Sequence, residues 1–227
     1  MSRQPSAVLW DMDGTLVDTE PYWMAAETAL VESHGGTWTH EDALQLVGNG
    51  LIDSAIILQN AGVDMDAETI VSHLTDAVQE SLRTHGVPFR PGARELLLDL
   101  KGAGIRTGLV TMSLRRMALG VVDLIDFEAF DVVVAGDDVE NAKPHPEPYL
   151  QAAALLGVDI ADAVVLEDSP TGLRAGIASG AVVLGVPHIV ALDHVGAHEL
   201  WPTLADRGAA DLVDLFDRMT SMTGASR

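Results

Sequence analysis

The chain contains no cysteine, which excludes disulfide bonds, thiolate nucleophiles and metal sites built on cysteine. Basic side chains are also scarce, because 13 lysines and arginines stand against 34 aspartates and glutamates, a formal net charge of −21. We therefore do not expect nucleic acid or an anionic membrane as a partner, since both require a basic surface. A small phosphorylated substrate remains compatible with this charge if a metal ion and a few cations bind it locally.

Long apolar runs are absent as well. No stretch reaches the roughly 18 residues that a membrane-spanning helix requires, and the N-terminus lacks the charged and then apolar pattern of a signal peptide. We therefore expect a cytoplasmic protein, and a monomer. Aromatic residues make up only 4% of the chain and hydrophobic residues 48%, so the core must consist mainly of aliphatic side chains and alanine.

Strand and helix patterns alternate along the chain and are interrupted once. Residues 6–11 form a short apolar run typical of a buried strand. The next part of the chain is purely helical, with predicted helices at 22–34, 41–46, 51–61 and 67–82. Alternation then resumes, with predicted helices at 93–102, 114–121, 146–156 and 171–178 and predicted strands at 105–111, 131–135, 163–167, 181–186 and near 210–213.

This order predicts an α/β fold with a Rossmann-like, three-layer core, in which helices cover both faces of a parallel sheet. Residues 1–17 and 87–227 would form this core domain, and residues 18–86 would form a small α-helical bundle inserted after the first strand. A chain of 227 residues is long enough for one core domain with such an appendage.

Polar side chains follow the predicted strands at the points where the strands end. Ligands of parallel sheets bind at the carboxyl ends of the strands, so these residues are expected to meet at one edge. They are Asp11 and Asp13 after the first strand, Thr111, Met112 and Ser113 after the second, Asp137, Asp138 and Lys143 after the third, and Glu167 and Asp168 after the fourth.

The acidic residues of this set predict a metal site. At a strand end the side chains of Asp11 and Asp13 leave on the same side, and Glu167 and Asp168 would join them from another strand. Two carboxylates about 4 Å apart repel by roughly 4 kcal/mol at an effective dielectric constant near 20. Such a cluster needs a cation, and all-oxygen ligands beside a phosphate favour Mg²⁺.

With a metal present, a carboxylate can attack phosphorus and form an aspartyl phosphate, and Asp11 is our candidate nucleophile. Asp13 can then serve as general acid and later as general base for water. Gly14 permits a tight turn and a close approach of backbone amides to the phosphate. Thr111 and Lys143 can bind phosphoryl oxygens, and Lys143 is one of only two lysines.

These residues lie in four segments that resemble the motifs of the haloacid dehalogenase superfamily in order and spacing. The segments are residues 11–19 (DMDGTLVDT), 111–113 (TMS), 143–146 (KPHP) and 167–172 (EDSPTG). The helical insert resembles the small cap, of C1 type, of subfamily I. The resemblance implies Asp11 as nucleophile, Asp13 as acid and base, and Mg²⁺ held by Asp11, the Asp13 carbonyl and Asp168, with Glu167 as a near or direct ligand.

Within the superfamily, Asp13 favours phosphoryl transfer, because the dehalogenases lack this second aspartate. Residues 18–23 (DTEPYW) resemble the branch of sugar-phosphate phosphatases and β-phosphoglucomutases. The mutases of that branch use a cap lysine, and both lysines here lie outside the insert. Met112 departs from the family pattern, since many relatives carry a small or amide residue there, and it could alter contacts near the phosphate.

The cap would select the substrate, because the core only binds phosphate. The candidates to face it are Glu20, Trp23 and residues 48–50, which include Asn49, together with Arg115 and Arg116 from the core. Trp23 could equally be part of the cap's own core, and Asp138 could cap a loop rather than contact the metal.

The residues thus predict a Mg²⁺-dependent phosphatase acting on a small phosphorylated metabolite, a sugar phosphate. The alternatives are a β-phosphoglucomutase-type isomerase, a phosphoglycolate phosphatase and, from another class, a silent phosphate-binding regulator. A haloacid dehalogenase is a more distant alternative.

Overall fold

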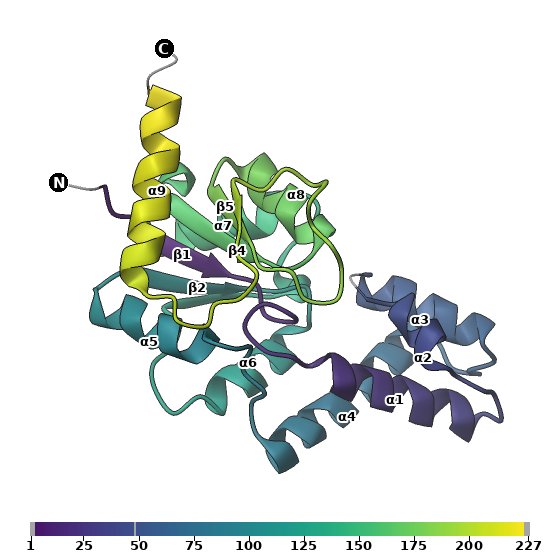
Figure 1. Cartoon of the computed structure of the whole chain (residues 1–227). Helices are drawn as coiled ribbons and strands as arrows, with labels where there is room; N and C mark the ends of the chain where they lie inside the picture. Colours follow the sequence, from purple (N-terminus) through teal and green to yellow (C-terminus); the bar gives the residue numbers. More distant parts are fainter. Residues whose placement is uncertain (1–2, 48, 225–227) are drawn as a thin grey trace.

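The computed structural model describes residues 3–47 and 49–224, with side chains up to residue 221. A six-stranded, fully parallel sheet in the order β3-β2-β1-β4-β5-β6 lies at its centre (Figure 1). The strands are β1 (Ala7–Trp10), β2 (Arg106–Val110), β3 (Val132–Val134), β4 (Ala163–Glu167), β5 (Val182–Gly185) and β6 (Glu199–Leu200). The predicted α/β fold with a parallel sheet is confirmed.

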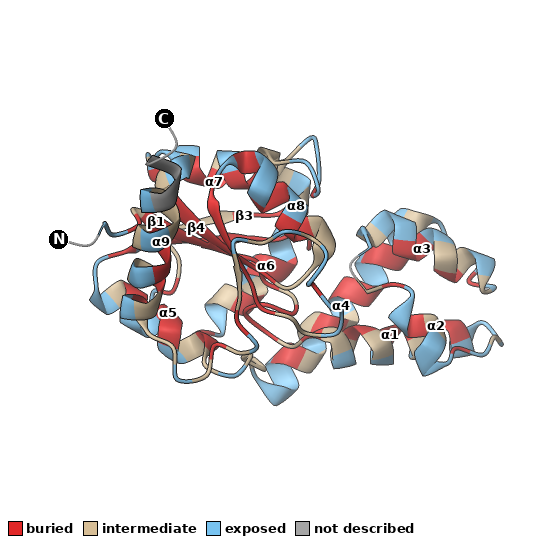
Figure 2. Ribbon diagram, turned by 45° about the horizontal axis from the view of Figure 1, so that its top comes forward, coloured by how far each residue is buried: buried red, intermediate tan, exposed pale blue. Residues whose placement is uncertain are grey.

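The inner strands are buried on both faces, and successive side chains divide between two apolar layers. Val8 and Trp10 of β1 pack on one face with α5 (Ala93–Gly102), α6 (Arg115–Asp123) and α9 (Ala209–Gly224). Ala7 and Leu9 pack on the other face with α7 (Glu147–Leu156) and α8 (Pro170–Ser179). The buried residues, red in Figure 2, accordingly concentrate on the strands and on the inner sides of these helices. Two short 3₁₀ turns, Gly136–Asp138 and Ile160–Asp162, complete the core.

Four helices between β1 and α5 form the helical insert. They are α1 (Glu20–Ser33), α2 (His40–Leu44), α3 (Leu51–Asn60) and α4 (Ala67–His85). Figure 1 shows them as a lobe beside the sheet. The two chain segments that connect the lobe to the core run side by side, because the Asp18 amide donates to the Pro88 carbonyl at 2.8 Å and Val17 bridges to Phe89. The insert therefore begins and ends at one place, beside the carboxyl end of β1.

The C-terminal segment differs from its prediction. Residues 210–213 were expected to form a strand, but they lie inside α9, where Leu212, Leu215 and Phe216 are buried. Their three- and four-residue spacing fits a helix face, so the short apolar run alone was misleading. The sixth strand is β6, which has only two residues and no recognisable pattern. Among the described residues, no helix combines the length and the hydropathy needed to cross a membrane.

Candidate active site

A buried lysine joins three strand ends. The Lys143 Nζ atom donates to Asp11 Oδ1 at 2.8 Å, to Glu167 Oε1 at 2.7 Å and to the Val110 carbonyl at 2.9 Å. Asp11 directly follows β1, Glu167 ends β4 and Val110 ends β2, so the ammonium lies across the carboxyl edge of the sheet. Strand ends meet there, as the sequence predicted for Asp11, Lys143 and Glu167.

Tyr149, on α7, completes the surroundings of this lysine. Its hydroxyl donates to Glu167 Oε1 at 2.6 Å, and its ring centre lies 4.9 Å from Lys143 Nζ, close enough for a cation–π contact. The other Glu167 oxygen accepts from the Ser169 hydroxyl at 3.1 Å and from the Ser169 amide at 3.4 Å. Both oxygens of Glu167 are thus engaged by the protein, which fixes Lys143 beside Asp11.

Three carboxylates lie close enough to share a metal ion. One oxygen from each of Asp11, Glu167 and Asp168 lies within 4.8 Å of the others. With Lys143 included, three negative charges and one positive charge leave a net charge of −2 at a buried position. A divalent cation would balance this charge, and oxygen donors are those that Mg²⁺ prefers. The residues present therefore fit the predicted metal.

The excess of negative charge in this cluster shifts the pKa values of its members. Burial raises the pKa of Asp11 to about 7, and the Glu167 charge adds to the effect despite the nearby Lys143. Burial and the charges of Asp11 and Glu167 likewise raise the pKa of Asp168 well above its usual range. Burial by itself lowers the pKa of Lys143, but Asp11 and Glu167 outweigh it and the net direction is upward. Lys143 is therefore a permanent cation.

Two glycines are needed for the carboxylates to approach the backbone. Gly14 has φ +88°, in the left-handed region, and a Cβ atom there would lie 2.1 Å from Asp168 Oδ2. A Cβ atom on Gly172 would lie 1.8 Å from Glu167 Oε1. Gly14 was predicted to allow close approach of amides to phosphate. In the structure, the group that approaches it closely is the side chain of Asp168.

The Asp13 carboxylate lies outside the three-carboxylate cluster found among the described residues, although four carboxylates were expected to face one pocket. Hydroxyl groups hold it instead. Thr19 Oγ1 donates to its Oδ1 at 2.5 Å, and its Oδ2 accepts from Ser113 Oγ at 2.7 Å and from Thr111 Oγ1 at 3.4 Å. β1 ends at Trp10, so the strand alternation assumed for Asp11 and Asp13 does not extend to Asp13. The Asp13 side chain is directed toward these hydroxyl groups rather than into the cluster.

Two predicted substrate-binding residues use their side chains internally. The Met112 sulfur accepts from the Lys143 amide at 3.3 Å, so this unusual residue supports the lysine loop. The Asn49 side-chain amide donates to the Gln45 carbonyl at 2.8 Å, at the end of α2. Gly48, predicted with Asn49, lies outside the described residues.

Glu20 is close to the site. It is the first residue of α1 and directly follows Thr19, which donates to Asp13. Burial raises the pKa of Glu20 to about 7, with contributions from the charges of Asp13, Glu27 and Asp18. The neighbouring Trp23 is only 8% exposed and belongs to the hydrophobic core, in agreement with the packing alternative.

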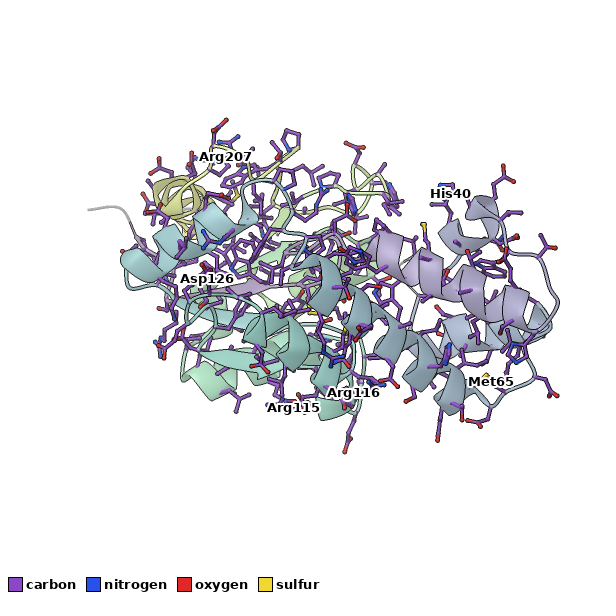
Figure 3. The ribbon with its side chains drawn as sticks, turned by 90° about the horizontal axis from the view of Figure 1, so that it is seen from below. His40, Met65, Arg115, Arg116, Asp126 and Arg207 are labelled. Atoms are coloured by element: carbon purple, nitrogen blue, oxygen red, sulfur yellow. The ribbon has the colours of Figure 1, made fainter. Side chains whose placement is uncertain are left out.

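The two arginines after the second motif bind other protein groups. Arg115 pairs with Asp138 at 2.6 Å, and its amide donates to Asp137 at 2.7 Å. Asp138 also accepts from the Ala135 amide at 2.9 Å and is not one of the three clustered carboxylates among the described residues. Arg116 pairs with Asp76 of α4, at the junction of core and insert (Figure 3).

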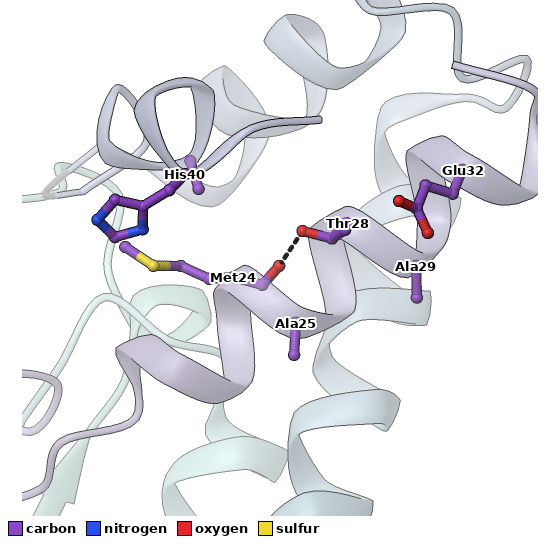
Figure 4. A pocket seen from close by; sticks show the side chains of 7 residues that line it. Met24, Ala25, Thr28, Ala29, Glu32 and His40 are labelled. Carbon is purple, nitrogen blue, oxygen red and sulfur yellow. Dashed lines mark hydrogen bonds between the residues drawn. The ribbon is translucent and has the colours of Figure 1, made fainter. Parts of the chain in front are cut away.

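A separate hollow of about 450 Å³ lies between α1 and α2. Figure 4 shows its lining, in which Thr28 donates to the Met24 carbonyl at 2.8 Å within α1. Its other lining residues are Ala25, Ala29, Glu32, His40 and Ala43. None of them was predicted to act in catalysis, and Lys143 and the carboxylate cluster are not part of it.

Comparison with known proteins agrees with the motifs. A family model described as haloacid dehalogenase-like hydrolase matches residues 8–186. The chain belongs to this family. Its resemblance to the superfamily and the expectation of a hydrolase are thereby confirmed.

Two relatives and one solved structure are similar to this haloacid dehalogenase-like hydrolase over most of its length. A phosphorylated carbohydrates phosphatase from Thermotoga maritima is 34% identical over 187 residues, which are 80% of this chain and 85% of the relative. Hexitol phosphatase B from Escherichia coli is 32% identical over 193 residues, 82% and 85% of the two chains. CbbY from Rhodobacter sphaeroides, solved in complex with phosphate, superimposes with a TM-score of 0.84 at 27% identity, covering 92% of this chain and 99% of that chain.

Some residues of this haloacid dehalogenase-like hydrolase that donate hydrogen bonds to the site carboxylates were not predicted from the sequence. Thr19 precedes α1, but its hydroxyl makes no cap hydrogen bond and donates to Asp13. Thr15 donates to Asp168 at 3.3 Å, and Tyr149 donates to Glu167. Thr15 lies within the first motif, so the motif itself was a signal, whereas nothing distinguishes Tyr149 from an ordinary buried aromatic residue.

Proposed function

We propose that this chain is a Mg²⁺-dependent phosphomonoesterase that hydrolyses a small phosphorylated metabolite, a sugar phosphate, through an aspartyl phosphate on Asp11. The observation that carries the proposal is the buried cluster of Asp11, Lys143, Glu167 and Asp168, with Asp13 held separately beside it. The names of the two relatives support a phosphatase of phosphorylated carbohydrates.

Lys143 holds Oδ1 of Asp11, so Oδ2 is the oxygen that we expect to attack phosphorus. A bond forms between Asp11 and phosphorus while the bond from phosphorus to the ester oxygen breaks, and Asp13 gives its proton to the leaving oxygen. Asp13 then removes a proton from water, which attacks the aspartyl phosphate, releases phosphate and restores Asp11. Thr19 and Ser113 orient Asp13 for both transfers by donating to its carboxylate.

Asp11, Asp168 and the Asp13 carbonyl would hold Mg²⁺, in agreement with the resemblance. Glu167 would act mainly on Lys143, because its oxygens already accept hydrogen bonds from Lys143, Tyr149 and Ser169. When bound, Mg²⁺ neutralises charge on the phosphoryl group and on Asp11 and so lowers the repulsion between them. Lys143 adds a fixed positive charge next to Asp11 Oδ1.

Residues 18–86 would act as a cap over residues 1–17 and 87–227. Closure of such a cap excludes bulk water from the site and completes the surroundings of the substrate. Hydrolysis is favoured over the mutase reaction because the cap segment contains no lysine. The mutases of the branch that this chain resembles use a cap lysine.

Hydrolysis of p-nitrophenyl phosphate tests the proposal. We expect activity with Mg²⁺, loss of activity with EDTA, and a fall in kcat of at least about a thousandfold in Asp11→Asn, because the nucleophile is removed. Asp64→Asn, the same change at an exposed position of the insert, serves as the control and should keep full activity. Full activity in Asp11→Asn, or activity indifferent to EDTA, would contradict the proposal.

A further inference from the structure

The helical insert carries almost no positive charge. Residues 18–86 contain twelve aspartates and glutamates, one arginine and no lysine. The arginine, Arg83, lies in the last turn of α4, where its side chain is 62% exposed and 3.5 Å from Glu80. Apart from Arg83, the insert therefore has no lysine or arginine that could bind an anionic leaving group.

In the described part of the chain, basic side chains of the core that border the insert already bind other protein groups. Arg116 binds Asp76 and the Ser72 carbonyl of α4, and Arg90 donates to the Pro187 carbonyl at 3.3 Å. His188 pairs with Asp18 at 3.0 Å, at the first connection between core and insert. Lys143 is bound by Asp11 and Glu167, beside the proposed nucleophile.

A carboxyl group lies close enough to Asp13 for the two charges to interact. Glu20 follows Thr19, whose hydroxyl donates to Asp13, and Asp13 is the group that protonates the leaving oxygen. Glu20 is only partly exposed and lies on the face of α1 that also carries the buried Glu27, seven residues further along. We therefore expect a leaving group bound next to Asp13 to lie near this carboxyl group.

We infer that the substrate is the monophosphate of a neutral polyhydroxy alcohol, and that Glu20 excludes leaving groups carrying a carboxylate or a second phosphate. The inference rests on the proposed function. Hydroxyl groups can donate to the Glu20 carboxyl, whereas a second anion would be desolvated beside it without a counter-charge. Specificity thus depends on a repulsive element as well as on hydrogen bonding.

Two substrates that share one carbon skeleton test this. Sorbitol 6-phosphate and 6-phosphogluconate differ at one end, where the first carries a hydroxyl and the second a carboxylate. We expect kcat/KM with Mg²⁺ to favour sorbitol 6-phosphate by at least about thirtyfold, a ratio that corresponds to one unfavourable charge contact. Fructose 1,6-bisphosphate should be disfavoured in the same way. A ratio below about threefold would overturn the inference.

Glu20→Gln should reduce the ratio by about tenfold, because it removes the charge and keeps the shape. Glu32→Gln, the same change at an exposed position near the other end of α1, is the matched control and should leave the ratio unchanged. Equal ratios in the two variants would contradict the role of Glu20. Raising NaCl from about 20 mM to about 300 mM should narrow the wild-type ratio by screening, which needs no variant.

Failure of the inference differs from failure of the proposed function. If the wild-type enzyme hydrolyses p-nitrophenyl phosphate with Mg²⁺ but accepts 6-phosphogluconate as readily as sorbitol 6-phosphate, only the inference is wrong. If it hydrolyses none of these esters, the proposed function itself is wrong.

Discussion

Glu27 is a charged residue in the core of the insert. It is 6% exposed, and burial raises its pKa to about 7 although the neighbouring Trp38 partly offsets the effect. Within the described residues, neither Glu27 Oε2 nor Trp38 Nε1 has a hydrogen-bond partner. A buried carboxylate with an oxygen that accepts no hydrogen bond is costly, so this residue should weaken the insert whenever it is ionised.

The sign of the pH effect follows from the direction of the shift. The pKa of Glu27 is higher in the folded chain than the value of 4.5 expected when unfolded, so the folded state binds the proton more tightly. The free energy of unfolding should therefore fall as pH rises from about 4.5 to about 7 and then level off. Glu27→Gln removes this loss and should gain stability over wild type by about 2 to 3 kcal/mol at pH 8, with little gain at pH 4.5.

Urea denaturation of wild type and Glu27→Gln between pH 4.5 and 8 measures the difference in their free energies of unfolding. The other titrating groups are the same in both proteins, so their contributions cancel in this difference. Glu32→Gln changes an exposed residue of the same helix, so its stability difference from wild type should stay flat across the range. If the stability difference between Glu27→Gln and wild type were also independent of pH, the pKa of Glu27 would not be raised by burial.

The roles of single residues could be predicted only where a strand end positions them. Asp11, Lys143 and Glu167 meet because parallel strands end at one edge, and a pattern of apolar runs reports those ends. Asp13 lies two residues later, beyond the end of β1 and just before the turn at Gly14, and its side chain takes a direction that alternation does not predict. Tyr149 reaches Glu167 from a helix, which no local pattern indicates.

Most helices and strands could be predicted from the sequence, but those near the C-terminus could not. The four helices of the insert lie close to their expected ranges, because their apolar spacing is repeated over several turns. β6 has two residues and pairs only through Leu184–Glu199 and Gly185–Leu200, so it depends on the sheet already being formed. The run at 210–213 was ambiguous because four residues cannot distinguish two periods.

A polar contact between α6 and α4 joins core and insert away from the two connecting segments. Arg116 of α6 pairs with Asp76 and donates to the Ser72 carbonyl at 3.0 Å and to Gln79 Oε1 at 3.2 Å. Gln79 returns a hydrogen bond to the Arg116 carbonyl at 2.7 Å. Because α6 begins just after Ser113, which donates to Asp13, the contact links the orientation of the insert to the site.

We expect Arg116→Met to loosen the insert without unfolding the core. The pair is largely exposed, with 38% and 67% of the two side chains accessible, so stability should fall by less than about 1 kcal/mol. The chain has no cysteine, so spin labels can be placed on Glu32→Cys in the insert and Leu155→Cys in the core, both exposed. Electron–electron distance measurements should show a broader distribution in Arg116→Met.

Arg115→Met provides the comparison. Its guanidinium binds Asp138 and the Val133 carbonyl, which both belong to the core, so the distance distribution should keep its wild-type width. An unchanged width in Arg116→Met would mean that the connecting segments alone hold the insert in place.

The molecule as a whole is strongly anionic, and this charge acts on stability in two ways. With a net charge of −21, the acidic side chains repel one another in the folded state at low salt concentration. The cluster of Asp11, Glu167 and Asp168 adds a local repulsion that is buried and therefore poorly screened. Monovalent salt should relieve the first effect, and only a bound divalent ion should relieve the second.

We therefore expect the Tm to rise as NaCl increases from about 10 mM to about 200 mM and then to change little. Mg²⁺ at saturating concentration should raise it further at constant ionic strength. A ligand at about a hundred times its Kd stabilises by roughly 2.7 kcal/mol, which for a chain of this size is a shift of about 5 to 10 °C. Differential scanning calorimetry with NaCl and MgCl₂ matched in ionic strength separates the two contributions.

Asp168→Asn distinguishes the local effect from the general one. The raised pKa of Asp168 means that its charge is unfavourable in the folded chain without a cation, so the neutral variant should unfold at a higher temperature than wild type in EDTA at pH 8. It should keep the NaCl response, because the net charge hardly changes, and lose most of the Mg²⁺ response together with phosphatase activity. If Asp168→Asn kept the full Mg²⁺ shift, the ion would bind elsewhere on the acidic surface. If the variant were less stable than wild type in EDTA, the hydrogen bond from Thr15 to Asp168 would outweigh the repulsion.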